Sequence, residues 1–329
     1  MSDQPIRLGI IGAGIMGERM LRAALEHAAD LVEVTAIWDA SAPALDRLEG
    51  LHGARTESAE AVLAASDCVY VATPPATHLR YAELALLAGR AVFLEKPLAT
   101  DVAAANEFVR EYGAARAAVN FPFASSFAVE RLRGWLDEGA IGAPTALEIE
   151  VGFATWPRPW QQAAASWLDA PAEGGFTREV VSHFLFLARR VLGPLALQTA
   201  SVDRAPGGTE RRIEARLTAG GLRTGLTGGV GTTGKDDHNT FTLHGTGALR
   251  LRDWSWAERQ RPDGSWAADP DAAPNEKMRP LVLRRQLEQV AAMTRGQPHK
   301  LATLSEAFEV QAAVEAILAP PADGPPSHA

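Results

Sequence analysis

The sequence predicts two domains, the first built on a doubly wound parallel sheet and the second an α/β domain with a largely antiparallel open sheet. Up to residue 120, short apolar runs alternate with helical patterns, which is typical of parallel strands joined by crossover helices. After residue 195, runs of strand type follow one another across glycine-rich turns, which is typical of antiparallel sheets. A glycine-rich turn directly after the first apolar run indicates which kind of parallel-sheet domain this is.

The composition is that of a soluble globular protein of two domains, with 47% hydrophobic and 22% charged residues in 329. The net charge of −8 is spread without blocks and argues against nucleic-acid or anionic-membrane partners. The single cysteine, Cys68, excludes a disulfide framework, and no ligand spacing suggests a metal. No basic leader or run of membrane-spanning length is present, which predicts a cytoplasmic protein. We place the domains at residues 1–121 and 122–320, with a disordered tail at 321–329.

The first strand pattern, Ile6–Ile11, runs directly into a Gly-Ala-Gly-Ile-Met-Gly turn and then into a helical run at Glu18–Ala28. This is the dinucleotide-binding fingerprint of a Rossmann domain in its strand–turn–helix setting. The first glycine permits the tight turn, the second lets a pyrophosphate approach the backbone, and the third lets helix and strand pack closely. The predicted cofactor contacts in this turn are Gly12, Gly14, Ile15, Met16 and Gly17.

The second strand, Leu31–Trp38, ends in Asp39, which lies 22 residues after Gly17. A carboxylate there can accept both hydroxyls of an adenine ribose and would repel a 2′-phosphate. The sequence therefore predicts NAD as the cofactor in preference to NADP. The alternative is that Asp39 only caps a helix that starts near Ala42.

Two further buried runs, Cys68–Ala72 and Ala91–Leu94, end in polar turns that contain proline, and Ala117–Asn120 reads as a last strand. Because the carboxyl ends of parallel strands meet at one edge, these turns should lie on the same rim as the glycine turn. Lys96 would sit at this rim, although a Glu-Lys-Pro sequence taken alone more often forms a surface turn. The helices expected in this region cover Ala59–Ala65, Leu79–Ala88 and Val102–Tyr112. The cofactor contacts expected from the rim are Thr73, Pro74, Pro75, His78, Glu95, Lys96 and Asn120.

Four ordered motifs carry a family resemblance, namely Gly12–Gly17, Asp39, Val71–Pro75 with His78, and Ala88–Leu98. Together they resemble the cofactor domain of the Gfo/Idh/MocA oxidoreductases, the family of glucose–fructose oxidoreductase and inositol dehydrogenase. The resemblance covers residues 6–120; it implies that Lys96 is the catalytic-site lysine and is compatible with a cis Lys96–Pro97 peptide. This chain departs from the family just after Asn120, where the usual arginine is absent.

The clearest feature of the second domain is an aromatic segment, Phe153–Trp167, which reads as a long loop. Aromatic faces stack on the C–H surfaces of sugars, and an arginine can meet a carboxylate or a hydroxyl. The rings could equally anchor the loop to the core, and the sequence leaves both readings open. The candidate substrate contacts are Trp156, Arg158, Trp160 and Trp167.

A helix predicted over Arg178–Leu192, with Thr177 as its N-cap, is apolar nearly all round and should be buried. Within it Glu179 and His183 lie four residues apart, on one face. The pair extends the resemblance, since the family carries a glycine cluster, an aspartate, and a histidine four residues later. Glu179 takes the aspartate position, and it remains open whether this longer acid is catalytic or only orients His183.

The remaining strands and helices should form the open sheet and its cover. The family pairs such sheets between subunits, so the resemblance implies a homodimer or homotetramer. The expected strands are Leu197–Val202, Arg211–Leu217, Leu222–Thr227, Thr240–His244 and Ala248–Arg252, and the expected closing helices are Leu281–Met293 and Leu304–Leu318.

The sequence thus predicts an NAD(P)-dependent oxidoreductase that transfers hydride between a nicotinamide and a sugar, cyclitol or related polyol, with the active site between the two domains. We expect His183 to be the general base, Lys96 to stabilise the developing alkoxide, and Glu179 to tune His183. Three alternatives stay open: a reductase of a non-sugar substrate of biliverdin or imine type, a non-catalytic dinucleotide-binding sensor, and a glycosidase that uses transient NAD-dependent redox.

Overall fold

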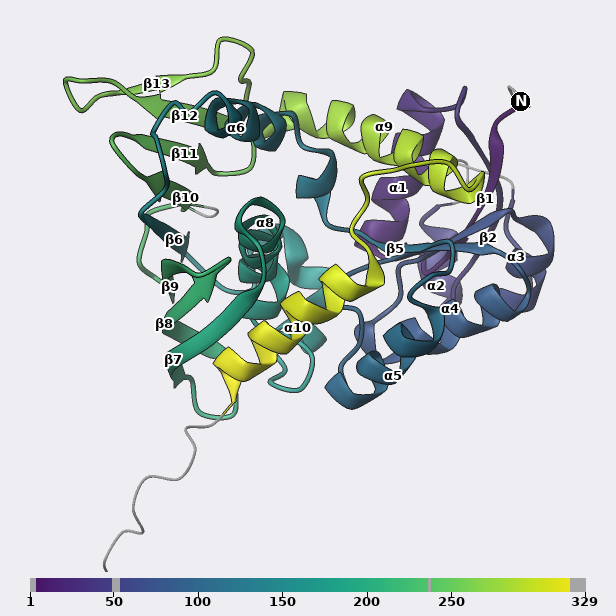
Figure 1. Cartoon of the computed structure of the whole chain (residues 1–329). Coiled ribbons are helices and arrows are strands. Elements are labelled where there is room, and N and C mark those ends of the chain that lie inside the picture. Colours follow the sequence, from purple (N-terminus) through teal and green to yellow (C-terminus); the bar gives the residue numbers. More distant parts are fainter. Residues whose placement is uncertain (1–3, 49–53, 236–237, 320–329) are drawn as a thin grey trace, which may run out of the picture. The chain divides into compact units, whose positions relative to one another are not determined.

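The computed structural model describes residues 4–48, 54–235 and 238–319, so the predicted tail at 321–329 lies outside the described residues. The chain forms two compact units (Figure 1). Unit 1 comprises Met1–Ser126 with Asn275–Phe308, and unit 2 comprises Phe127–Pro274 with Glu309–Ala329. The linear division expected from the sequence assigned residues 275–308 to the second domain, whereas here they cluster with the first.

Unit 1 contains a five-stranded parallel sheet in the order β2-β1-β3-β4-β5, which confirms the doubly wound class. The order reverses at β1, so the carboxyl ends of β1 and β3 meet at the switch point where such sheets bind ligands. Every residue of β3 and β4 is buried, as expected for strands covered on both faces. The strands are β1 (Ile6–Ile11), β2 (Val32–Trp38), β3 (Cys68–Val71), β4 (Ala91–Leu94) and β5 (Ala117–Val119).

The helices of unit 1 cover the sheet, and two of them begin at side-chain caps. Ser58 accepts a hydrogen bond from the backbone of α3, and Asp101 accepts two from the backbone of α5. Helix α9 buries Leu287, Val290 and Met293 in the same core as β1, β2 and α1, which explains why this late segment belongs to unit 1. The helices are α1 (Ile15–His27), α2 (Ala42–Asp46), α3 (Ala59–Ala65), α4 (His78–Leu87), α5 (Val102–Tyr112) and α9 (Asn275–Thr294), with short 3₁₀ turns η1 (Pro75–Thr77) and η2 (Pro122–Ser125).

Unit 2 contains an eight-stranded sheet in the order β13-β12-β11-β10-β6-β9-β8-β7. All neighbouring strands are antiparallel except β6 and β9, so the largely antiparallel sheet is confirmed. The sequence located five of these strands after residue 195 but missed the short pair β12 and β13. The strands are β6 (Ala146–Phe153), β7 (Leu195–Arg204), β8 (Glu210–Ala219), β9 (Leu222–Val230), β10 (His238–His244), β11 (Ala248–Arg252), β12 (Trp256–Gln260) and β13 (Trp266–Ala268).

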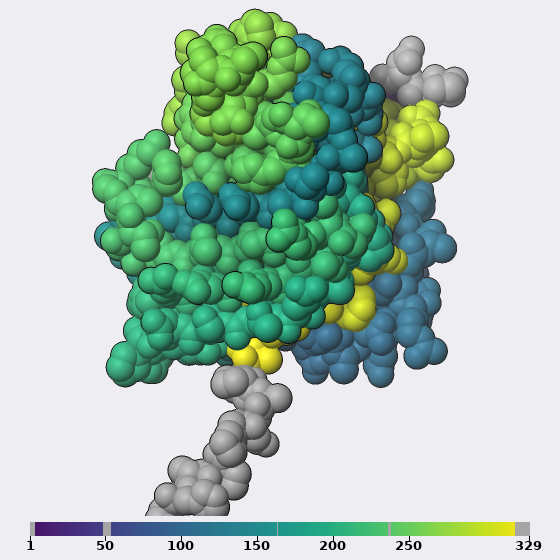
Figure 2. Space-filling view, turned by 60° about the vertical axis from the view of Figure 1, so that its left-hand side comes forward, coloured from purple at the N-terminus to yellow at the C-terminus, as the bar shows by residue number. Residues whose placement is uncertain are grey.

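One face of this sheet is covered and the other is open. Helix α8 (Ser182–Leu192) packs on β7 and β8, while α6 (Phe127–Asp137) packs on β11 and β12. Burial alternates along β8, with Ile213, Ala215 and Leu217 turned toward the core. Figure 2 looks onto the strands of unit 2, in teal and green, from the side that no described helix covers. Among the described residues, no helix combines the length and apolar character needed to cross a membrane.

Helix α10 (Leu304–Leu318) is tied to the segment before α8 by Arg178. The guanidinium makes a two-point ion pair with Glu315, at 2.6 Å from Nε to Oε1 and 2.7 Å from Nη2 to Oε2. Its Nη1 donates to the backbone carbonyls of Pro171 and Gly174 at 2.9 and 2.8 Å. Because all these donors are satisfied at a side chain that is only 11% exposed, the pair should contribute to stability more than a surface pair does.

We expect Arg178→Met to lower the melting temperature by about 5 °C or more, because it leaves the Glu315 carboxylate without its partner. Differential scanning calorimetry measures this shift. The matched control is Arg212→Met, whose pair with Glu214 is 65% and 53% exposed and should change the melting temperature by less than about 2 °C. Equal, small shifts in both variants would show that the Arg178 pair adds nothing to the fold.

Candidate active site

The glycine turn after β1 is shaped by packing at two positions and left open at the third. Gly12 has φ +107°, and a Cβ there would lie 2.5 Å from the backbone of Ala72. A Cβ on Gly17 would lie 1.9 Å from the Gly12 carbonyl oxygen, since α1 sits directly on the turn. Around Gly14, no atom outside the glycine and its two chain neighbours lies within 4 Å of the position of a Cβ. The turn therefore presents bare backbone and the N-terminus of α1 to open space, which suits a pyrophosphate.

Asp39 lies against this turn at the end of β2. Its Oδ2 accepts a hydrogen bond from the backbone N–H of Ala13 at 2.7 Å, and its Oδ1 accepts one from Ser41, the N-cap residue of α2, also at 2.7 Å. The two interpretations of Asp39 are thus compatible, because the carboxylate both supports the start of α2 and adjoins the glycine turn. Each carboxylate oxygen can accept a further hydrogen bond. Together with the open backbone at Gly14, this arrangement fits the adenosine and phosphate part of a dinucleotide.

His78 joins the two loops that follow β3 and β4. The side chain is fully buried, with Nδ1 at 2.8 Å from the carbonyl oxygen of Pro97 and Nε2 at 2.8 Å from that of Thr73. Both partners are acceptors, so a neutral ring can donate to only one of them, while the imidazolium form would donate to both. His78 therefore holds the Thr73 turn and the Lys96–Pro97 turn in a fixed relation, a role that its place in the cofactor motif did not reveal.

Glu95 is the centre of a buried polar network at the end of β4. The side chain is 6% exposed, and its Oε1 accepts hydrogen bonds from the Tyr70 hydroxyl and from Asn120 Nδ2, the latter at 2.7 Å. Asn120 Oδ1 in turn accepts from Gln286 Nε2 of α9 at 2.5 Å. Burial and the adjacent Glu95 raise the pKa of Tyr70 well above its usual value, so this hydroxyl remains a donor. The alternative that Glu-Lys-Pro forms a surface turn is therefore wrong for Glu95, because its side chain is buried.

Lys96 follows Glu95 directly, at the carboxyl end of β4, and is partly buried. The Lys96–Pro97 peptide is cis, which confirms what the resemblance allowed. Within unit 1 the lysine thus leaves a strand end that is held by the Glu95 network on one side and by His78 on the other.

The aromatic segment is not the structureless loop expected from the sequence. It folds into a 3₁₀ helix, η3 (Pro159–Ala164), and one helical turn, α7 (Ala165–Leu168). Trp156 is buried against Phe153, with ring centroids 5.2 Å apart, and donates from Nε1 to the carbonyl of Leu168 at 3.3 Å. Trp156 therefore anchors the segment to the core, which is one of the two interpretations that the sequence left open.

The other three candidate substrate contacts differ in exposure. Arg158 is 6% exposed, and its guanidinium lies 4.7 Å from the centroid of the Trp160 ring while Nε donates to Gln161 at 2.9 Å. Trp160 is 48% exposed and Trp167 is partly buried. Trp160 thus keeps one ring face turned away from the core, held in place by the arginine beneath it.

The start of the histidine helix differs from the prediction. The segment begins with a π-helical turn, η4 (Thr177–Val181), and Phe176 rather than Thr177 occupies the N-cap position. The backbone N–H of Thr177 donates instead to Oε1 of Glu210 in β8, at 2.6 Å. Gly175 has φ +102°, and a Cβ there would lie 2.4 Å from the same carboxylate. Gly175 therefore lets a buried glutamate approach the turn, a contact that no local sequence pattern indicates.

His183 lies in the first turn of α8 and is 7% exposed, while Glu179 is partly buried in the π-helical turn before it. The imidazole packs edge-on against the indole of Trp254, with centroids 5.3 Å apart and an interplanar angle of 81°. Helix residues Phe184–Ala188 are buried, which confirms the predicted burial of this helix. Neither Trp254 nor Glu210 was expected from the sequence.

Both halves of the chain match profiles of one family. Residues 6–120 match the profile described as oxidoreductase family, NAD-binding Rossmann fold, and residues 129–250 match the GFO/IDH/MocA C-terminal domain. The chain belongs to the Gfo/Idh/MocA oxidoreductase family. The second match covers β6, α8 and the strands up to β11, so the family assignment extends through the segment that carries Glu179 and His183.

Individual relatives support this membership at modest identity. Inositol 2-dehydrogenase of Rhizobium meliloti is 27% identical over 212 residues, 61% of each protein. A dTDP-3,4-didehydro-2,6-dideoxy-alpha-D-glucose 3-reductase of Actinomadura kijaniata is 37% identical over 164 residues, 47% of each. The matched region thus spans about half to three fifths of the curated relatives. An inositol dehydrogenase homolog from Azotobacter vinelandii, solved with NAD⁺, shares the fold with a TM-score of 0.79 at 18% identity, covering 96% of this chain and 95% of that one.

We expect Gly14→Val to fold normally but to weaken NAD binding at least about tenfold, because the new side chain fills only the open space over the turn. The backbone of Gly14, at φ −75° and ψ −166°, accepts any residue. Isothermal titration with NAD measures the affinity. In Gly17→Ala the added Cβ meets a backbone oxygen, so this variant should instead lose thermal stability. Wild-type NAD affinity in Gly14→Val would contradict the assignment of the turn.

Proposed function

We propose that the protein is an NAD-dependent oxidoreductase that transfers hydride between a nicotinamide and a CH–OH group of a sugar, cyclitol or related polyol. The observation that carries the proposal is the match of both domains to one oxidoreductase family, with Lys96 and His183 inside the matched ranges. The relatives named above act, by name, on a cyclitol and on a nucleotide-linked deoxysugar, which supports a polyhydroxylated substrate.

The cofactor would be held by unit 1. The glycine turn and the N-terminus of α1 would receive the pyrophosphate, and Asp39 would receive the adenine ribose, which favours NAD over NADP. The remaining proposed contacts come from the rim loops: Thr73, Pro74, Pro75, His78, Glu95, Lys96 and Asn120. Among these, His78, Glu95 and Asn120 have side chains directed to protein partners, so their contribution is to fix the loops. When bound, the nicotinamide supplies the acceptor or donor of hydride.

The protein must then handle the proton of the substrate hydroxyl. His183 is the proposed general base, because it is the histidine of the matched helix and its ring packs edge-on against Trp254. The Lys96 ammonium would donate to the same oxygen and stabilise charge that develops as the proton leaves. Glu179, one turn before His183, is proposed to tune it. Trp160 and Trp167, with Arg158 beneath the former, are the proposed contacts for the C–H faces of the sugar.

Three further assignments are proposed at the level of the whole protein. Residues 1–121 bind the dinucleotide, while residues 122–320 carry the substrate and the subunit contacts. The second proposed assignment is a homodimer or homotetramer whose subunits meet at the uncovered face of the unit 2 sheet. The third proposed assignment is a cytoplasmic location, where a freely exchanging NAD cofactor is available.

The test is a substrate panel. Purified protein is incubated with NAD, and separately with NADP, together with cyclitols, aldoses, anhydrosugars, sugar nucleotides and an aryl glycoside. In a second set it is incubated with NADH and biliverdin or a cyclic imine, and absorbance at 340 nm reports NADH in both sets. Turnover of at least one polyol supports the proposal. Tight NAD binding without turnover of any polyol, biliverdin or imine would favour the sensor, and release of an aglycone without net NADH would favour the glycosidase.

Cofactor choice should depend on Asp39. We expect Asp39→Ser combined with Ala40→Arg to shift the ratio of kcat/KM for NAD over NADP by at least about tenfold toward NADP, because a repulsive carboxylate is replaced by a cation. Steady-state kinetics with both cofactors measure the ratio. The assignment of Asp39 fails if the wild type already uses NADP as well as NAD.

Lys96→Met should fold, bind NAD, and lose at least about 10²-fold in kcat, because it removes a donor that acts only as charge develops. The control is Lys277→Met on the exposed surface of α9, which should leave kcat unchanged. Near-wild-type turnover in Lys96→Met would refute the catalytic role.

His183→Asn should cost about 10²–10⁴ in kcat and spare NAD binding, since the amide cannot accept the proton. Glu179→Asp restores the usual acid of the family and should be tolerated better than Glu179→Ala. Single-turnover kinetics at saturating substrate separate these effects from binding. Full activity in His183→Asn would return His183 to a purely structural role.

A further inference from the structure

The turn between β11 and β12 consists of Asp253, Trp254 and Ser255 and is unusually constrained. Asp253 has φ +52°, and it is the one non-glycine residue with positive φ among the described residues. An aspartate in this region is strained and persists only where the surroundings fix the backbone. The strained residue immediately precedes Trp254, so the backbone conformation decides where the indole is directed.

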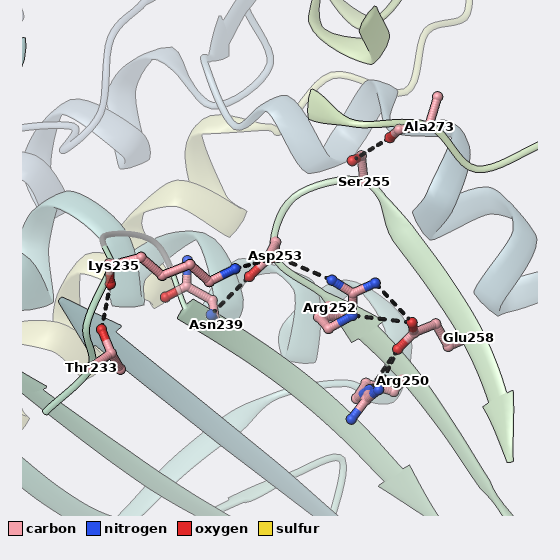
Figure 3. Close-up of polar contacts among 9 residues, drawn as sticks. All are labelled: Thr233, Lys235, Asn239, Arg250, Arg252, Asp253, Ser255, Glu258 and Ala273. Atoms are coloured by element: carbon pink, nitrogen blue, oxygen red, sulfur yellow. Dashed lines mark hydrogen bonds and ion pairs between the residues drawn. The ribbon is translucent and has the colours of Figure 1, made fainter. Parts of the chain in front are cut away.

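Hydrogen bonds hold this turn on both sides of Trp254 (Figure 3). The Asp253 N–H donates to the carbonyl of Asn239 at 2.7 Å, and the Asn239 N–H donates back to Asp253 Oδ1 at 3.3 Å. On the other side, the Ser255 hydroxyl donates to the carbonyl of Ala273 at 2.8 Å. The turn is thus fastened to β10 before the tryptophan and to the segment leading into α9 after it.

Charged side chains complete the support of Asp253. Its Oδ2 lies 3.3 Å from Arg252 Nη1 and 3.9 Å from Lys235 Nζ. Arg252 also pairs with Glu258, at 3.0 Å, and Glu258 is only 7% exposed and pairs with Arg250 as well. Figure 3 shows these side chains as one connected chain of contacts along β11 and β12. The carboxylate that anchors the strained residue is therefore itself fixed.

These hydrogen bonds and ion pairs hold Trp254 in contact with the start of α8. Its ring lies edge-on to His183, at 5.3 Å and 81°, and tilted on Phe184, at 5.7 Å and 42°. An indole offers no acceptor that could take a proton from the imidazole, so it limits rotation of the ring without competing for the proton. A general base needs such a fixed direction, because proton transfer requires its nitrogen within hydrogen-bond reach of the hydroxyl.

We propose that Trp254 is a positioning residue for His183, delivered by the strained Asp253 turn, and this rests on His183 being the base of the proposed function. Two other roles would produce the same contact. Trp254 could fill space in unit 2 without effect on catalysis, or its exposed ring surface could stack on the substrate directly. These roles make different kinetic predictions.

A double-mutant cycle distinguishes them. Kinetics are measured for Trp254→Ala, His183→Asn and the double variant in the full-length protein. If Trp254 acts through His183, Trp254→Ala lowers kcat at least about tenfold while the KM for substrate and the Kd for NAD change less than about threefold. In the His183→Asn background the same substitution then costs less than about twofold, because there is no base left to orient.

Two further variants serve as controls. Trp254→Phe keeps an aromatic edge against the imidazole and should restore most of the lost kcat. Trp135→Ala removes a partly buried tryptophan of α6, outside the Asp253 network, and should leave kcat unchanged. A loss in Trp135→Ala equal to that in Trp254→Ala would overturn the proposal in favour of a general disruption of unit 2.

Other outcomes also decide the question. An equal loss from Trp254→Ala in both backgrounds, or a rise in KM with kcat unchanged, would assign Trp254 to substrate stacking or to the fold. If His183→Asn keeps full activity, it is the proposed base that fails, which is a separate result. A readout without turnover is the imidazole NMR signal of His183, identified by its absence in His183→Asn. The ring current of Trp254 should displace it, and an unchanged, equally sharp signal in Trp254→Ala would overturn the proposal.

Discussion

The burial of the Glu95 carboxylate is the constraint on which the candidate catalytic end of unit 1 depends. A carboxylate removed from water is costly unless donors surround it. Here Tyr70 from β3 and Asn120 from the end of β5 supply those donors, and Gln286 of α9 holds Asn120. The requirement to satisfy one buried carboxylate thus brings together the two strands that flank β4 and a helix from late in the chain, and it fixes the point at which Lys96 leaves the sheet.

Unit 2 also contains a buried glutamate that accepts a hydrogen bond close to a proposed catalytic segment. Glu210 of β8 is 2% exposed and receives the backbone N–H of Thr177, and only a glycine at position 175 leaves room for its approach. This contact fixes the first residue of the π-helical turn, and hence the place where Glu179 and His183 emerge. In both units a buried glutamate that need not react itself positions the segment that carries a proposed catalytic side chain.

The local patterns of the sequence were sufficient for the architecture. The glycine turn, the buried runs that end at a common edge and the later alternating strands each depend on residues close in sequence, so β1 to β5 and β7 to β11 could be predicted together with the doubly wound class. The same holds for Asp39 and Lys96, whose position follows from the strand that precedes each of them. Strands β12 and β13 were missed because they form neither a fully buried run, as the equally short β3 and β4 do, nor a regular alternation of buried and exposed residues.

The sequence by itself determined which segments have a buried face and where most of the strands end, because periodicity and turn residues act over a few positions. Only the tertiary structure decided their partners. Gln286 meets Asn120 across 166 residues, and Trp254 meets His183 from another element; no local pattern encodes such a pairing. Trp156 points inward while Trp160 remains half exposed for the same reason, since the choice depends on what packs behind each ring.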